Sequence, residues 1–338
     1  MDTVVVGVDG GGTRTRCVVV DTDGRVLGRA EAGGANPNSS PDPVGALAEA
    51  LRGAVAQATA AEPGVADRVA AGVFGLAGAG GAGHADALAR ATAAWRAAGL
   101  AGAPEVVGDL VVNFAAGTPE SEGLVLVAGT GAIAGRIADG AVVRRCDGYG
   151  WLVGDRGSGT WLGRMAVTAV LDALDGRGPT TALTRTVPAA LLDELAHTAH
   201  EPGSAEAHAL AQRLVRAVYG SPPAALAALS PVVDAAARAG DETARTIVAE
   251  AADHLVASVR ALAPSPGEAL VFAGGILTGP TLLAELVTAG FTAAEPAYAV
   301  SLAGPGELGA AMVALRRTGH ASALARIHAD LLPWSARS

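Results

Sequence analysis

The hydrophobic pattern in the first third of the chain alternates between short apolar runs and segments with helical spacing. Short runs of apolar and β-branched residues favour buried strands, and apolar residues three or four positions apart favour helices. The pattern predicts strands at 3–8, 14–21, 25–32, 68–76 and 104–109 and helices at 43–61 and 83–99. This part of the chain should therefore form three hairpin-linked strands, then a helix, a strand, a helix and a strand.

The same pattern starts again after residue 117. Strands are predicted at 123–128, 132–137, 141–146, 268–273 and 297–301, and helices at 280–289, 305–317 and 320–334. A long helical stretch, interrupted by prolines, is predicted over about 160–263. The repeated three-strand opening indicates a weak internal duplication, and thus two related α/β halves.

Composition narrows the chemistry of this chain. Its 338 residues carry a formal net charge of −9, and all 24 basic residues are arginine. Without lysine there is no Walker P-loop lysine, no protein-kinase strand lysine and no Schiff-base lysine. The acidic balance argues against a nucleic-acid partner, which needs basic surfaces to neutralise phosphates. A nucleotide would have to be held by backbone N–H groups, a metal ion or arginine.

Cysteine content and apolar runs bear on redox chemistry and location. The two cysteines, Cys17 and Cys146, are too few for a disulfide framework or a multi-cysteine zinc site. The first residues lack the basic and apolar regions of a signal peptide, and no apolar run is long enough to suggest a membrane span. We therefore expect a cytoplasmic protein with no membrane partner.

The first candidate binding element is a glycine turn between the first two strands. It consists of Asp9, Gly10, Gly11, Gly12, Thr13 and Arg14. It is not the dinucleotide-binding fingerprint, because a strand follows it and Thr15 stands at the third glycine position. Consecutive glycines let backbone N–H groups face an anion, Thr13 and Thr15 can add hydroxyl donors, and Asp9 can hold Mg²⁺. The alternative is a plain tight hairpin.

Two further glycine turns follow later strands. Gly129, Thr130 and Gly131 occupy the equivalent place in the second half, and Gly274 with Gly275 joins a strand to a helix. Paired with the first turn, the second predicts two phosphate loops facing each other across a cleft. The third turn is suited to hold an adenosine moiety by close backbone approach. A hairpin turn and a simple strand-to-helix turn are the alternatives.

Together these motifs resemble the superfamily of actin, the large heat-shock chaperones and the sugar kinases. The two phosphate motifs correspond to VGVDGGGTRTRCVVVD and VLVAGTGAIAGRI, the adenosine motif to LVFAGGIL and the second connecting helix to PGELGAAMVAL. Within the superfamily, the chain is most similar to the BadF-type ATPases, and among them to N-acetylglucosamine kinases and actinobacterial glucosamine kinases. The resemblance covers essentially the whole chain.

The resemblance implies an α/β fold of two RNase-H-like (actin-like ATPase) domains around a cleft. The N-terminal domain would comprise 1–117 with the C-terminal helix 306–338, and the other domain 118–305 with its large helical insertion. ATP and Mg²⁺ are the implied cofactors. The glycines of the three turns, with Thr13, Arg14 and Thr130, would contact the nucleotide, and Asp9 would hold the metal.

The resemblance also implies a catalytic residue, Asp109. In this family the catalytic aspartate ends the last strand of the first domain and begins the connecting helix. Asp109 would take the proton from the sugar 6-hydroxyl as that oxygen attacks the γ-phosphate of ATP. The residue alone leaves open an ordinary helix N-cap, a place that aspartate favours.

A loop from Cys146 to Gly159 resembles the sugar loop of N-acetylglucosamine kinases, and Cys146 matches a position near the sugar. The implied sugar contacts are Asn38, Asp109, Asp147, Gly148, Tyr149, Gly150 and Asp155. Asp155 would accept hydrogen bonds from sugar hydroxyls. Asn38 matches a substrate-contacting asparagine, and an Asx turn beside Pro37 is the alternative.

Asp147 stands where N-acetylglucosamine kinases typically have glycine. A carboxylate there would favour the free ammonium of glucosamine over a neutral acetamide. We therefore expect a glucosamine kinase, with an N-acetylglucosamine kinase as the alternative. If Asp147 instead caps a turn or faces solvent, this argument is lost.

Two functions of other classes are less favoured. An ATP-driven activator of a radical dehydratase, which the BadF-type group also contains, holds an iron–sulfur cluster with two cysteines from each subunit, and this chain has no paired-cysteine loop. A sugar-responsive repressor would need an N-terminal helix-turn-helix, but a strand is expected from Thr3. The expected partners are an amino sugar and ATP, and the tail helix is a candidate homodimer contact.

Overall fold

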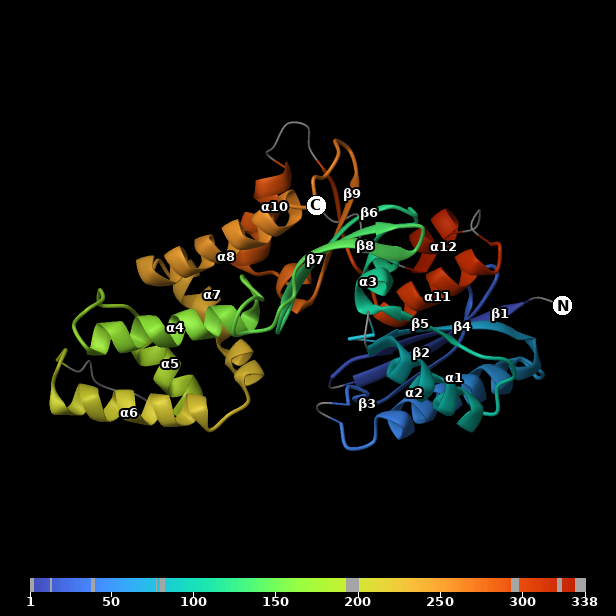
Figure 1. Cartoon of the computed structure of the whole chain (residues 1–338), viewed down its shortest axis with the longest axis horizontal. Coiled ribbons are helices and arrows are strands. Elements are labelled where there is room, and N and C mark those ends of the chain that lie inside the picture. The colour runs from blue at the N-terminus through green and yellow to red at the C-terminus, as the bar shows by residue number, and fades with distance from the viewer. Residues whose placement is uncertain are drawn as a thin grey trace. The chain divides into compact units, whose positions relative to one another are not determined.

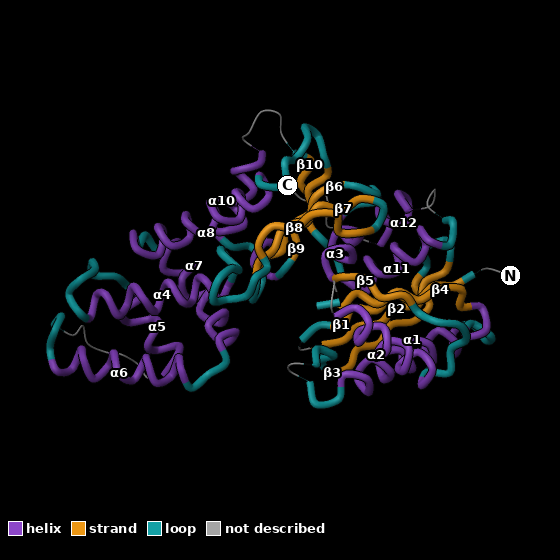
Figure 2. Tube along the Cα trace, in the orientation of Figure 1, coloured by secondary structure: helices purple, strands orange, loops and turns teal. Residues whose placement is uncertain are grey.

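The computed structural model describes residues 3–12, 14–37, 40–76, 78–79, 83–192, 201–292, 298–320 and 324–331. Figure 1 labels the elements and Figure 2 colours them by type. The chain divides into two compact units, one of Met1–Val125, Arg136–Val143 and Ser301–Ser338, the other of Leu126–Gly135 and Arg144–Val300. The expected domain bounds, 1–117 with 306–338 and 118–305, remain a prediction.

Five strands form the first sheet, in the order β3-β2-β1-β4-β5. They are β1 (Val4–Gly10), β2 (Arg14–Asp21), β3 (Val26–Gly33), β4 (Val69–Leu76) and β5 (Glu105–Gly108). The first three strands pair antiparallel, as the predicted hairpins require, whereas β4 runs parallel to β1 and β5 parallel to β4. Because parallel strands end at the same edge, residues that follow β1 and β5 come to one edge of this sheet.

Helices cover both faces of the first sheet (Figure 1). On one face lie α1 (Pro43–Ala61) and α2 (His84–Ala97). Between these two helices, the chain forms the 3₁₀ turn η1 (Ala66–Arg68) and then β4. On the other face lie α3 (Asp109–Gly117) and α11 (Gly306–Arg317), and α12 (Leu324–Leu331) packs on α11. At the start of α1, Asp42 accepts a hydrogen bond from the Gly45 N–H at 2.8 Å, which fixes where this helix begins.

The core beneath α1 and α2 is built mainly from valine, leucine and alanine, in line with the low aromatic content. Phe74 and Trp95 are its two large rings, and they meet edge to face with centroids 6.2 Å apart. On the opposite face, a Cβ on Gly7 would lie 2.1 Å from the Glu307 carbonyl oxygen. Only glycine at this position lets α11 approach β1 so closely.

The second sheet repeats the strand order of the first. Its order is β10-β9-β6-β7-β8. The strands are β6 (Gly123–Ala128), β7 (Ala132–Ala138), β8 (Ala141–Asp147), β9 (Ala269–Ala273) and β10 (Ala299–Leu302). Counted along each half, both sheets place their strands in the order 3-2-1-4-5. The predicted internal duplication is therefore confirmed at the level of sheet topology.

The predicted helical stretch separates into several helices. They are α4 (Gly159–Leu174), α5 (Leu183–Leu192), α6 (Ala205–Tyr219), the 3₁₀ helix η3 (Pro223–Leu229), α7 (Ser230–Arg238) and α8 (Glu242–Arg260). After β9 come α9 (Gly275–Thr278) and α10 (Leu282–Thr292), and α10 packs on α8. One of the prolines of this stretch, Pro188, lies inside α5 and does not interrupt the helix.

Candidate active site

Asp9 lies near the end of β1, where its carboxylate meets the start of α11. A Cβ on Gly306 would lie 2.6 Å from the Asp9 Cγ, so the first turn of the helix leaves no space for a side chain there. Burial raises the pKa of Asp9 to about 6; the charges of Glu307 and, less strongly, Asp109 add to the rise, while Arg16 lowers it. This carboxylate sits in a negative environment that suits a divalent cation.

Some backbone groups of the first glycine turn form hydrogen bonds within the chain. The Gly11 N–H donates to the Arg14 carbonyl at 3.0 Å, and the Ala35 N–H donates to the Gly11 carbonyl at 3.0 Å. The Gly11 N–H is thus engaged within the turn, and its predicted nucleotide contact remains a prediction. Gly10 ends β1, and a Cβ there would clash with Leu76, so this glycine serves packing. A nucleotide contact of Gly10 and Gly12 remains a prediction.

The side chains of Arg14 and Thr15, at the start of β2, differ in their exposure. Arg14 is 63% exposed, and its Nη1 lies 3.5 Å from Glu31 Oε1, so it forms a surface ion pair. Thr15 is fully buried and its hydroxyl has no hydrogen-bond partner, so the expectation that it adds a donor stays a prediction. Thr13 lies outside the described residues.

Asp109 directly follows β5 and is the first residue of α3. Its Oδ1 accepts a hydrogen bond from the Leu110 N–H at 3.0 Å. The N-cap is Gly108, so the alternative of Asp109 as an ordinary N-cap does not hold. Burial raises the pKa of Asp109, and the Leu110 N–H opposes this rise. A partly buried carboxylate at the edge where Asp9 also lies is suited to accept a proton.

The second glycine turn joins β6 to β7 and is held by the start of α4. The Gly129 N–H donates to the Gly131 carbonyl at 2.9 Å. The Gly159 N–H donates to the Gly129 carbonyl at 2.7 Å, and Thr160 Oγ1 donates to the Thr130 carbonyl at 2.8 Å. Residues at the end of the sugar loop therefore fix the position of this turn.

In the sugar loop, Asp147 is bound to the backbone. Its Oδ1 accepts from the Asp155 N–H at 2.7 Å, and its Oδ2 accepts from the Arg156 N–H at 2.9 Å. Asp147 and Asp155 have φ angles of 64° and 52°, in the left-handed region that aspartate tolerates better than most residues. Asp147 thus caps the loop, as one alternative expected. Its contact with a sugar remains a prediction.

Asp155 connects the sugar loop to the second glycine turn. A Cβ on Gly131 would lie 3.0 Å from Asp155 Oδ2, and Asp155 Oδ1 accepts from the Gly150 N–H at 3.4 Å. Burial raises the pKa of Asp155, while the N–H groups of Gly150 and Ala132 lower it. The structure thus places Asp155, a predicted sugar contact, next to Gly131, a predicted phosphate contact.

The remaining predicted sugar residues are less enclosed. Tyr149 is 61% exposed, and the guanidinium carbon of Arg145 lies 5.7 Å from its ring centroid. Gly148 and Gly150 adopt positive φ angles of 75° and 88° in the same loop. Asn38 lies outside the described residues, so its predicted contact is not placed.

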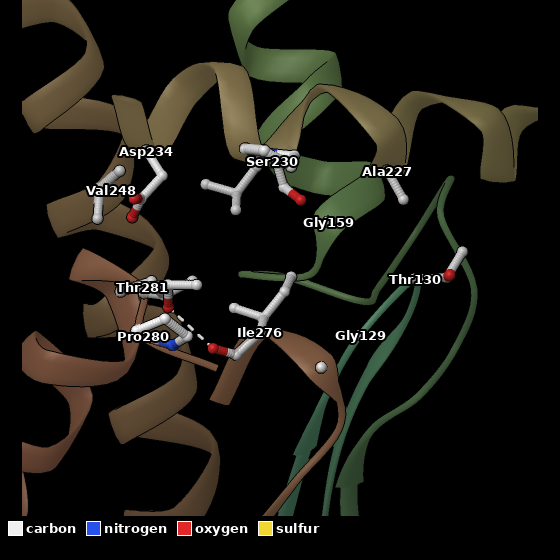
Figure 3. Close-up of a pocket in the computed structure, with 14 residues that line it drawn as sticks. Gly129, Thr130, Gly159, Ala227, Ser230, Asp234, Val248, Ile276, Pro280 and Thr281 are labelled. Atoms are coloured by element: carbon white, nitrogen blue, oxygen red, sulfur yellow. Dashed lines mark hydrogen bonds between the residues drawn. The ribbon is translucent and has the colours of Figure 1, made fainter. Parts of the chain in front are cut away.

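The third glycine turn borders the main cavity of the second unit, which Figure 3 shows. Gly274 has a φ of 85°, and a Cβ there would lie 2.4 Å from the Ala128 carbonyl oxygen, so both conformation and space require glycine. Gly275, in contrast, has no heavy atom within 4 Å of its Cβ position. The cavity measures about 480 Å³, and its walls include Gly129, Thr130 and Gly275.

Sequence reasoning missed the polar residues on the far wall of this cavity. Asp234 accepts from the Leu282 N–H at 2.6 Å and from Arg238 Nε at 3.0 Å. Thr281 Oγ1 donates to the Ile276 carbonyl at 2.8 Å, the dashed line in Figure 3. No local pattern marks Asp234, because helix packing alone brings α7 to turns that lie far away in the sequence.

The described residues contain neither a clustered metal site nor a membrane-spanning helix. No group of three or more histidine, cysteine, aspartate or glutamate side chains there is arranged to hold a metal ion. No described helix is long and apolar enough to cross a membrane. Cys17 is 1% exposed and burial raises its pKa, so this thiol is not available as a ligand of an iron–sulfur cluster.

Several known proteins are similar to this chain in sequence or in fold. An N-acetylmuramic acid/N-acetylglucosamine kinase of Clostridium acetobutylicum is 30% identical over 261 residues, 76% of this chain and 78% of the relative. An N-acetyl-D-glucosamine kinase of Dictyostelium discoideum is 26% identical over 302 residues, 84% of this chain and 89% of the relative. A Chromobacterium violaceum structure assigned as an N-acetylglucosamine kinase superposes with a TM-score of 0.64 at 25% identity, over 93% of this chain and 99% of that one.

The resemblance inferred from the glycine motifs agrees with these similarities. Residues 6–314 match the BadF/BadG/BcrA/BcrD ATPase family, so the match includes both sheets and α3 and extends through most of α11. The two five-stranded sheets agree with the two-domain actin-like ATPase fold of sugar kinases. The chain therefore belongs to the BadF/BadG/BcrA/BcrD ATPase family.

Proposed function

We propose that this chain is an ATP-dependent amino-sugar kinase that transfers the γ-phosphoryl group of ATP to the 6-hydroxyl of its sugar. The observation that carries the proposal is the cavity of about 480 Å³ that the second and third glycine turns border together. Its volume is typical of small-molecule sites, and its glycines permit close backbone approach. Family membership supports ATP as the nucleotide, and the similar kinases support an amino sugar.

Asp109 is the proposed general base. Phosphoryl transfer requires mainly positioning of the nucleophile and stabilisation of charge. A carboxylate whose pKa is raised by burial accepts a proton more readily than an exposed one, and Asp109 has this property. In the proposed reaction, it orients the 6-hydroxyl and takes its proton while the oxygen bonds to phosphorus and the bond to ADP breaks.

Asp9 is the proposed residue for Mg²⁺. Its carboxylate lies at the start of α11. Burial and, after it, the negative charge of Glu307 raise its pKa, and a bound cation would offset both effects. When bound, Mg²⁺ would neutralise charge on the β and γ phosphates of ATP. The short-range hydrogen bonds around Gly129 and Gly159 would keep the second phosphate turn rigid.

N-acetylglucosamine is the first expected substrate. Both Asp147 oxygens already accept backbone hydrogen bonds, which weakens the argument for an ammonium partner. Two of the similar proteins are kinases of N-acetylglucosamine, and one of these also has N-acetylmuramic acid in its name. Glucosamine, predicted from the sequence, stays a second candidate because the loop holds the carboxylates of both Asp147 and Asp155.

A panel of sugars tests the proposal. Release of ADP from MgATP would be measured with N-acetylglucosamine, glucosamine, N-acetylmuramic acid and glucose, and the phosphorylated carbon identified by NMR. We expect transfer to the 6-hydroxyl, with the highest kcat/KM for N-acetylglucosamine. No transfer to any of these sugars would refute the proposed function.

Asp147→Asn tests the choice between the two amino sugars. This variant keeps the size of the side chain and removes its charge. If the carboxylate contacts an ammonium, the ratio of kcat/KM for glucosamine to that for N-acetylglucosamine should fall by about ten-fold or more. If Asp147 only builds the loop, both values should fall together and the ratio should stay constant, which is the result that we expect.

A further inference from the structure

The most isolated buried carboxylate of the described residues is that of Glu307, in the first turn of α11. Glu307 is 5% exposed, and its Oε2 has no solvent contact and no hydrogen-bond partner. A buried carboxylate oxygen without a partner is costly, because it has lost its water and gained nothing in return. The unpartnered carboxylate oxygen of Glu307, in a member of an ATPase family, therefore suggests that this side chain contacts a bound ligand.

The surroundings of Glu307 identify the charge that such a ligand should have. Glu307 follows Gly306, which contacts the Asp9 carboxylate, and its own carbonyl packs on Gly7 of β1. Among the neighbouring charges, that of Glu307 has the strongest effect in raising the pKa of Asp9. Asp109 adds further negative charge, and the opposing Arg16 is itself bound to Glu31 at 3.2 Å.

We propose that Glu307 is a second carboxylate of the divalent-cation site centred on Asp9, and that its buried oxygen faces the cation or a water bound to it. The inference rests on the proposed function and adds a residue to that site. Mg²⁺ in nucleotide enzymes is held by one or two carboxylates, with waters and phosphate oxygens in the other positions. Two carboxylates therefore suffice for such a site.

The experiment measures Mn²⁺ binding instead of turnover. Mn²⁺ would be titrated into the full chain with saturating ADP, and free Mn²⁺ followed by its EPR signal. Glu307→Gln should weaken Mn²⁺ binding roughly 10- to 100-fold, the usual cost of losing a residue that supports a metal. The matched control is Glu105→Gln, which removes an exposed carboxylate of the same unit, paired with Arg317, and should leave the affinity unchanged.

Each outcome decides the inference. Unchanged Mn²⁺ affinity in a folded Glu307→Gln protein, or an equal loss in Glu105→Gln, would overturn it. If Glu307→Gln melts far below the wild type in EDTA, Glu307→Asp is used as the test variant instead. It keeps the negative charge, but its side chain is shorter by one methylene group. Weaker binding in that variant supports the inference and unchanged binding overturns it.

The metal titration also separates this inference from the proposed function. Loss of Mn²⁺ affinity in Glu307→Gln, together with a wild-type chain that phosphorylates no sugar of the panel, would retain the cation site and reject the kinase. Sugar phosphorylation together with unchanged Mn²⁺ affinity would retain the kinase and reject the role of Glu307.

Discussion

Two aspartates with raised pKa values, Asp9 and Asp109, end or follow parallel strands of the first sheet. Burial is the main cause of the raised pKa of both. At Asp9 the charge of Glu307 adds to the rise and that of Arg16 opposes it, whereas at Asp109 backbone N–H groups oppose the rise. The additional negative charge beside Asp9 fits the proposed cation site, and the raised pKa of Asp109 fits the proposed base.

Asp109→Asn tests the base at the residue scale. The variant should lower kcat roughly 10²- to 10⁴-fold, because the amide cannot take the proton from the sugar hydroxyl. Binding of sugar and ADP, measured by calorimetry, should change by less than about three-fold, since shape and burial are kept. The matched control is Asp86→Asn, in the first turn of α2, an exposed residue that should have no effect. Near-normal turnover of Asp109→Asn would remove Asp109 from the mechanism.

The raised pKa of Asp109 also has a consequence for the pH profile. Below its pKa the carboxylate is protonated and cannot act as a base, so kcat/KM should fall as the pH decreases through that value. This fall should begin at a higher pH than an exposed aspartate would give. In Asp109→Asn, the residual activity should lose this dependence.

At the scale of elements, the glycine turns combine two different demands on glycine. Gly274 must be glycine because of its left-handed φ and its contact with the Ala128 carbonyl, whereas Gly275 faces open space. The sequence shows only two adjacent glycines. It could not distinguish them, because the difference depends on β6 lying beside β9.

This pair gives a prediction with an internal control. Gly274→Ala should lower the melting temperature, because its Cβ would overlap the Ala128 carbonyl and the residue would be strained; a cost of about 1–3 kcal/mol is typical of overpacking. Gly275→Val should leave the melting temperature almost unchanged but weaken ADP binding, because the side chain would enter the cavity. If Gly275→Val binds ADP as the wild type does, this cavity does not hold the nucleotide.

Most elements were predictable because their patterns are local. The valine-rich strands and the amphipathic helices were placed within a few residues, as β1 and α1 illustrate. The conformation of the sugar loop was not predictable. Asp147 and Asp155 adopt positive φ only because hydrogen bonds across the loop support them, and a single sequence does not reveal such bonds.

At the scale of the whole molecule, the repeated strand order is the strongest feature that the sequence revealed. The hairpin openings of the two halves differ in residues but share their order of apolar runs, and both sheets have the resulting topology. The composition of the main cavity was not predictable. Ser230 and Asp234 reach it through helix packing, about a hundred residues from the second glycine turn.

The stability of the molecule should depend on pH through Asp9. Its pKa is about 6 in the folded chain and 3.8 ordinarily, so between these values the folded state binds the proton more strongly than the unfolded state. The Asp9 contribution to the free energy of unfolding therefore decreases as the pH rises from about 4 to about 6 and is constant above. Asp9→Asn should remove this decrease and be more stable at pH 7, by about 1–3 kcal/mol.

Urea unfolding in EDTA at several pH values checks this prediction. The difference in free energy between Asp9→Asn and the wild type should be small near pH 4 and grow toward pH 6. A difference that is the same at every pH would show that Asp9 titrates normally in the folded chain. The removal of metal matters, because a cation bound at Asp9 would itself lower the pKa of the carboxylate.

The two cysteines differ in burial, so the unmodified chain can be labelled with a fluorescent dye at a single site. Cys17 lies inside the first sheet, whereas Cys146 is partly accessible on β8, directly before Asp147. A thiol-reactive dye should therefore attach once to the folded protein and twice after denaturation. The single label would stand beside the sugar loop, where its fluorescence could follow sugar binding without any engineered residue.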